Sequence, residues 1–82
     1  MVKINVRLFA ILSDQAGVAA IPLDLPDGST VATAERMVLA AHPALGKYVA
    51  RSAMAVNRAY VKRETVLLEG DELALIPPVS GG

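Results

Sequence analysis

Residues 69–82 have the sequence Glu69-Gly70-Asp71-Glu72-Leu73-Ala74-Leu75-Ile76-Pro77-Pro78-Val79-Ser80-Gly81-Gly82, which is the most specific segment of the chain. The acidic residues around Gly70 are typical of a turn, and the apolar run 73–76 predicts a strand. Proline fixes φ and has no N–H, so the two prolines favour an extended tail over 77–82. At ~3.3 Å per extended residue, residues 78–82 span roughly 15 Å.

The diglycine end of this segment is typical of a protein that is itself the substrate of another enzyme. Glycine has no Cβ, so Gly81 and Gly82 leave a thin thread whose carboxylate can enter a narrow enzyme channel. The alternative is a frayed chain end that happens to contain glycine, since chain ends are often unconstrained. The strand before the tail favours the first interpretation, in which the tail is presented to an enzyme, because this strand orders the base of the tail and leaves the tip free.

Two further strands are expected in the first third of the chain. Apolar and polar residues alternate over 2–8, the period that marks a half-buried strand. A second alternation over 21–25 predicts another strand, and Pro22 favours an edge position because it cannot donate a ladder hydrogen bond. Apolar residues continue over 9–12, where a short helical turn is expected before the pattern breaks at 13–17.

One main helix is expected over 31–41. The preceding segment 26–30 supplies turn residues, followed by a serine and a threonine that can cap the helix. The apolar stripe of this helix consists of Val31, Ala34, Met37 or Val38, and Ala41. Pro43 disfavours a helical conformation at His42, so the helix ends there.

The remaining residues predict a loop and several short extended segments. The loop contains Gly46, and the extended segments cover 54–56, 60–61 and 66–68. The expected architecture is therefore a single α+β domain over 1–82, with a mixed sheet and one main helix packed across it. This is the β-grasp, or ubiquitin-like, arrangement.

Composition excludes several functional classes. The 82 residues carry eight Lys and Arg against eight Asp and Glu, so no bulk charge favours nucleic acid or an anionic membrane. No stretch approaches the ~20 apolar residues that span a bilayer, and residues 1–7 alternate instead of forming a signal peptide, so a cytoplasmic protein is expected. The chain has no cysteine and one histidine, which argues against thiolate chemistry and a metal site. If this chain carries sulfur, its carboxyl end must hold it.

The chain as a whole resembles a known family. The similarity lies in Val2-Lys3-Ile4, Leu8-Phe9-Ala10, Leu25-Pro26-Asp27-Gly28-Ser29-Thr30-Val31, Ala55-Val56-Asn57 and the segment 69–82. These residues are similar to the MoaD family, the small subunits of molybdopterin synthase. Members of this family are ubiquitin-like sulfur carriers related to the thiamin-pathway carrier.

The resemblance implies a chemistry for the tail. Gly82 would be adenylated by an ATP-dependent, MoeB-like activating enzyme, converted to a thiocarboxylate, and used to donate sulfur to cyclic pyranopterin monophosphate. Gly81 would give the backbone room to thread into both enzymes. No tightly bound cofactor is implied, since ATP is used by the activating enzyme. The chain would be a non-catalytic, sulfur-donating subunit in a heterotetramer with a MoaE-like large subunit.

The resemblance also implies partner-binding residues. These are Phe9, Ile76, Pro77, Pro78, Val79 and Ser80. The first two fall where the family has bulky apolar docking residues, although both can equally belong to the core. The pair Ser13-Asp14 departs from the family, because many relatives have Arg-Glu there, so a partner contact through that arginine is not expected in this chain.

Other functions remain open at this stage. The same carrier mechanism can supply sulfur to thiamin thiazole, tRNA or an amino acid. A ubiquitin-like protein modifier would instead join Gly82 to a lysine through an isopeptide bond. A third alternative is a β-grasp binding module whose terminus takes no part in chemistry.

Overall fold

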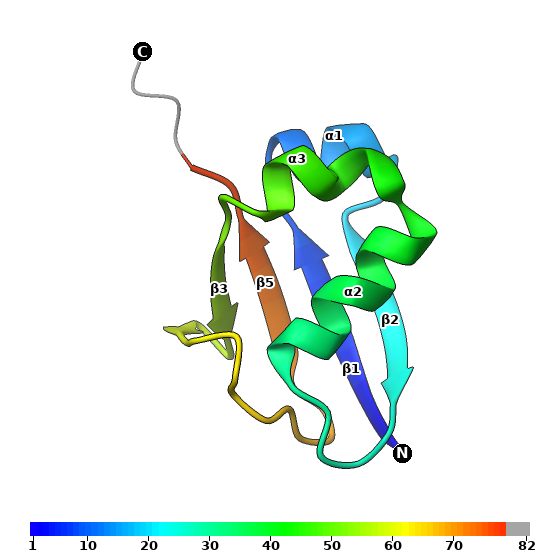
Figure 1. Ribbon diagram of the computed structural model, residues 1–82, viewed down its shortest axis with the longest axis vertical. Coiled ribbons are helices and arrows are strands. Elements are labelled where there is room, and N and C mark those ends of the chain that lie inside the picture. Colours follow the sequence, from blue (N-terminus) through cyan, green and yellow to red (C-terminus); the bar gives the residue numbers. More distant parts are fainter. Residues whose placement is uncertain (79–82) are drawn as a thin grey trace.

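A mixed five-stranded sheet with helices on one face forms the body of the protein. The computed structural model describes residues 1–78 (Figure 1). The elements are β1 Val2–Leu8, α1 Ile11–Ala16, β2 Ala20–Leu25, α2 Val31–Ala41, the 3₁₀ helix η1 Pro43–Leu45, α3 Gly46–Val49, β3 Ala53–Val56, β4 Ala59–Tyr60 and β5 Glu72–Ile76. The strand order is β2-β1-β5-β3-β4, and α2 crosses one face of this sheet. This confirms the expected α+β class.

The centre of the sheet joins the two ends of the described chain. β1 pairs antiparallel with β2 and parallel with β5, and β5 pairs antiparallel with β3. The alternation predicted for 2–8 is confirmed, since Ile4, Val6 and Leu8 are all buried. Leu73 pairs with Val6 and is fully buried, so β1 and β5 share one apolar face. This face packs against α2 and forms the core.

Pro22 lies on the edge strand, as predicted. The Leu8 N–H donates to Ala19 O at 2.8 Å, and hydrogen-bonded pairs alternate along an antiparallel ladder. Asn5 and Pro22 are therefore a non-hydrogen-bonded pair, and the Pro22 nitrogen faces away from β1. Proline therefore removes no hydrogen bond between β1 and β2. It does remove a donor from the exposed edge of the sheet, which disfavours pairing with another chain.

The main helix has its predicted bounds. Thr30 is its N-cap, and the Thr30 side chain accepts a hydrogen bond from the Thr33 N–H at 3.4 Å. Val31, Ala34 and Val38 are fully buried, but the expectation that Ala41 extends this stripe is wrong, because Ala41 is exposed. The chain turns into η1 immediately after α2, and the larger side chain of Leu45 fills the core at that end.

The expectation of a loop around Gly46 is wrong. Residues 43–49 form η1 and α3, with Pro43 at the first helical position, where an N–H is not needed. Leu45 and Val49 are fully buried and four residues apart, so they share one helical face. Gly46 adopts ordinary right-handed helical angles of φ −53° and ψ −44°. The helical spacing of the two buried residues outweighs the low helix propensity of glycine.

The segment 66–68 does not form the expected extended piece of sheet. Val66 makes only an isolated bridge with Thr30. The preceding residues are held by the helices instead, since Arg63 Nε donates to Glu35 Oε2 at 2.7 Å and Arg63 Nη2 to Val49 O at 3.3 Å. Fully buried Leu67 then joins the core. A short antiparallel bridge also positions this segment, since the Leu67 N–H donates to Ser29 O at 2.8 Å and the Val31 N–H donates to Thr65 O at 2.9 Å.

Asn57 joins the β3–β4 hairpin to the start of β5. Its φ is +51°, in the left-handed region that asparagine tolerates better than most residues. Asn57 Nδ2 donates to Asp71 Oδ1 at 2.9 Å, and Asn57 Oδ1 accepts from the Glu72 N–H at 3.0 Å. One side chain thus fixes the two turns at this end of the sheet relative to each other.

We expect Asn57→Ala to lower the free energy of unfolding by ~2–3 kcal/mol, because it removes two hydrogen bonds and replaces asparagine by a residue that tolerates positive φ less well. Asn57→Gly is the matched variant, since it loses the same hydrogen bonds without the conformational cost, and should lose ~1 kcal/mol less. Urea denaturation of both variants measures the difference. Equal losses would show that the left-handed conformation contributes nothing.

Candidate functional site

The parallel pairing of β1 and β5 brings their carboxyl ends to the same edge of the sheet. Phe9 directly follows β1, and Pro77 directly follows β5. Helices α1 and α3 lie beside this edge (Figure 1). Two segments from opposite ends of the sequence are thereby placed next to each other at the base of the tail.

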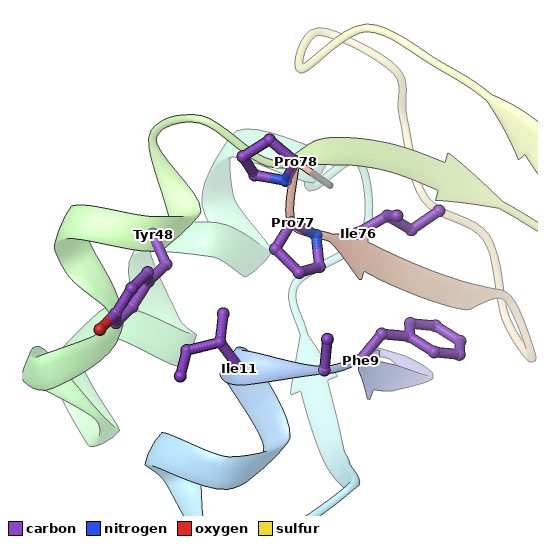
Figure 2. A pocket seen from close by; sticks show the side chains of 7 residues that line it. Phe9, Ile11, Tyr48, Ile76, Pro77 and Pro78 are labelled. Atoms are coloured by element: carbon purple, nitrogen blue, oxygen red, sulfur yellow. The ribbon is translucent and has the colours of Figure 1, made fainter. Parts of the chain in front are cut away.

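A pocket of about 600 Å³ lies at this edge. It is lined by Phe9, Ala10, Ile11, Tyr48, Ile76, Pro77 and Pro78. Figure 2 shows Phe9 and Ile76 at one end of the pocket and Tyr48 at the other, with Ile11 and Pro77 between them. Apart from the Tyr48 hydroxyl, the lining side chains are apolar. We call this the tail-base pocket.

The structure places four of the predicted partner-binding residues together. Phe9, Ile76, Pro77 and Pro78 all line the tail-base pocket. Phe9 is 41% exposed and therefore lies outside the core, and Ile76 is half-buried. Pro77 is buried and Pro78 is exposed, so the chain passes from the packed body to the surface between these two residues. Their role in docking stays a prediction.

The remaining predicted site residues lie outside the described part of the chain. These are Val79, Ser80, Gly81 and Gly82. The expected tail boundary at residue 77 and the roles of the two glycines therefore stay predictions.

The sheet face opposite α2 continues from the tail-base pocket. A second pocket of about 390 Å³ on this face shares Phe9 and Ile76 and extends to Tyr60, which is 76% exposed. Arg7 forms an ion pair with Glu72 at 3.5 Å, and its guanidinium carbon lies 5.6 Å from the centre of the Phe9 ring. The face is apolar near the tail and charged beyond it, which is the pattern of a docking surface with a polar rim.

Positive side chains on α3 and just after it border the tail base. Lys47 and Arg51 line a third pocket, of about 380 Å³, together with Tyr48 and Pro78. The Lys47 ammonium lies 5.2 Å from the centre of the Tyr48 ring, a distance at which a cation–π interaction holds both side chains in place. Tyr48 thus forms the boundary between the apolar pocket and this positive one.

Sequence reasoning missed three lining residues: Ala10, Ile11 and Tyr48. Tyr48 was missed because a loop was expected around Gly46, and no sequence pattern indicates that Tyr48 lies on a short helix beside the pocket. The other two lie at the β1–α1 junction. There the departure at Ser13 is explained locally, since Ser13 Oγ donates to Ala10 O at 2.9 Å and Ser13 does not line the pocket.

Neither a metal site nor a membrane span emerges from residues 1–78. Within that range, no group of three His, Asp or Glu side chains is close enough to hold a metal ion. The helices there are also too short or too polar to cross a bilayer.

The fold and the tail-base pocket define a ubiquitin-like β-grasp protein. A family model described as the ThiS family matches residues 6–82. The chain is 38% identical to a molybdopterin synthase sulfur carrier subunit from Chlamydomonas reinhardtii, with 98% of this chain and 99% of the relative covered. The chain therefore belongs to the ThiS family, and the resemblance to molybdopterin synthase sulfur carriers drawn from its sequence is confirmed.

Solved structures give the same fold. The crystal structure of small archaeal modifier protein 1 from Haloferax volcanii superposes with a TM-score of 0.90 at 33% identity, covering 98% of this chain and 99% of that one. A protein–protein complex of subunits 1 and 2 of molybdopterin-converting factor from Helicobacter pylori contains a chain that matches with a TM-score of 0.70 at 25% identity, covering 98% and 99%. These likenesses confirm the β-grasp fold.

Proposed function

We propose that this chain is the sulfur carrier subunit of molybdopterin synthase. The observation that carries the proposal is the full-length similarity to a sulfur carrier subunit of that enzyme, at 38% identity. The diglycine at 81–82 and the absence of cysteine support it, because they leave the carboxyl end as the place for sulfur. The chain donates sulfur and leaves catalysis to its partners.

The proposed chemistry uses one group of this chain, the Gly82 carboxylate. A carboxylate is ionised at neutral pH and is a poor acylating agent. Its oxygen attacks the α-phosphate of ATP on the activating enzyme, and pyrophosphate leaves. A sulfur donor then displaces AMP from the acyl adenylate, which gives a thiocarboxylate. The thiocarboxylate sulfur bonds to cyclic pyranopterin monophosphate, and water then cleaves the acyl–sulfur bond, which leaves the sulfur on the acceptor and returns Gly82 to a carboxylate for another activation.

The tail-base pocket supports docking on a large subunit. At ~3.3 Å per residue, Gly82 lies at most roughly 15 Å from Pro78, so an enzyme that holds Gly82 comes close to the surface around Pro78. The pocket and the adjoining sheet face supply apolar area there, with Phe9 and Ile76 in both. The Helicobacter pylori complex of two subunits is the model for this assembly. We propose a heterotetramer with two copies of each subunit, acting in the cytoplasm.

Intact-mass analysis of the protein from its native cells tests the proposal. A gain of roughly 16 Da is ambiguous by itself, because methionine oxidation adds nearly the same mass and the chain has three methionines. A thiol-alkylating reagent removes the ambiguity, since no cysteine is present to react. We expect one added label, localised to Gly82 by fragmentation.

An unlabelled chain would contradict the proposal if it stayed unlabelled after incubation with the activating enzyme, ATP and a sulfur donor. The favoured alternative would then be a protein modifier, because the chain is also 33% identical to small archaeal modifier protein 1. A search for peptides branched at lysine, with a Gly81-Gly82 remnant, would detect that function.

A further inference from the structure

Ala10 has a backbone conformation that is rare for any residue but glycine. Its φ is +51° and its ψ is −126°, at the junction between β1 and α1. Here the β-carbon is crowded by the backbone, and such conformations persist only where the surrounding structure imposes them. A glycine would adopt these angles without strain. The chain nevertheless has alanine at this exposed position.

Hydrogen bonds on both sides of Ala10 impose this conformation. The Ala10 carbonyl accepts from Ser13 Oγ at 2.9 Å and from the Asp14 N–H at 3.2 Å. The neighbouring Phe9 carbonyl accepts from the Leu12 N–H at 3.0 Å. Donors at the start of α1 therefore fix the junction, and they also fix the directions of the two residues that flank Ala10.

The flanking residues form much of the tail-base pocket. Phe9 and Ile11 both line it, and so does Ala10 itself. In Figure 2 the Phe9 side chain lies at one end of the pocket, and Ile11 points toward Tyr48 at the other. The strained turn thus spreads two apolar side chains apart and keeps the space between them open.

We propose that Ala10 is a positioning residue, whose methyl group and fixed turn shape the tail-base pocket to receive an apolar side chain of the synthase large subunit. This inference rests on the proposed function. Pro77 and Pro78 form one wall of the pocket, so an enzyme that takes the tail approaches the chain next to it. We assign the pocket to the large subunit because the similar chain in the Helicobacter pylori structure belongs to a complex of subunits 1 and 2.

The test separates stability from binding with Ala10→Gly. Gly relieves the strain but loosens the turn and removes the methyl group. We expect its urea midpoint to equal or exceed that of the wild-type chain. Its Kd for the purified large subunit should rise by about fivefold or more, measured by titration calorimetry. Ala40→Gly is the matched control, because Ala40 is exposed within α2. It should lower the midpoint and leave the Kd unchanged.

Any other result would contradict one step of this inference. An Ala10→Gly chain that binds as tightly as wild type would exclude a positioning role, and a midpoint lowered as far as that of Ala40→Gly would exclude the strain. Sedimentation of the chain alone would assign the pocket to a second copy if it showed a dimer that Ala10→Gly disrupts. A wild-type chain that does not bind the large subunit would refute the proposed function itself.

Discussion

Removal of Gly81 and Gly82 should abolish sulfur transfer and leave the fold intact. The expected activity is zero within detection, because Gly82 carries the acyl group that we propose to accept sulfur. The core residues lie between Ile4 and Leu75, so the deletion removes none of them. Molybdopterin formation in a reconstituted synthase measures activity, and urea denaturation should give an unchanged midpoint.

A chain with one residue appended after Gly82 is the matched control for this deletion. It keeps both glycines but moves the carboxylate away from the position that the activating enzyme binds. A sulfur carrier should be inactive in this form, whereas a binding module should be unaffected. Full activity of either altered chain would rule out Gly82 as the sulfur-bearing residue.

Phe9→Ala should weaken association with the large subunit by roughly 30-fold or more, since buried aromatic anchors at interfaces contribute at least ~2 kcal/mol. Phe9 borders both the tail-base pocket and the uncovered sheet face. Because its ring is 41% exposed in the free chain, the cost to folding should stay within ~1 kcal/mol. Titration calorimetry with the purified large subunit measures the loss.

Met37→Ala is the control for Phe9→Ala. Met37 is 38% exposed, nearly the same as Phe9, but it lies on α2 and lines none of the three pockets described above. Its replacement should leave the affinity within twofold of the wild-type value. Equal losses of affinity from the two substitutions would mean that the interface with the large subunit does not lie at the tail base.

Local sequence signals were sufficient for the strands and for the main helix. The period of two over 2–8 and the cap before Val31 act within a few residues, so the sequence alone could reveal them. The segment 43–49 could not be predicted in this way, because proline and glycine obscured the spacing of Leu45 and Val49. The extended pattern of 66–68 gives a single antiparallel bridge between Val66 and Thr30 and no strand of the sheet, because this segment pairs with the start of α2.

Only part of the candidate site could be predicted from the sequence. Phe9 and Ile76 could be predicted because a family resemblance marked them, and the structure places both at the tail base. Tyr48 and Ala10 depend on geometry that sequence patterns do not contain. Tyr48 reaches the pocket through the packing of a short helix, and Ala10 is distinguished only by its backbone angles.

The position of β5 between β1 and β3 governs when this chain can fold during its synthesis. The strand made last among the described residues occupies the middle of the sheet, so β1 lacks one neighbour until Ile76 has left the ribosome. Before then, Val6 and Leu8 lack their partners Leu73 and Leu75, so the core cannot be completed until translation has passed β5. A polypeptide that stops upstream of β5 lacks the central strand of the sheet and the core residues Leu73 and Leu75, so we expect it to stay unfolded.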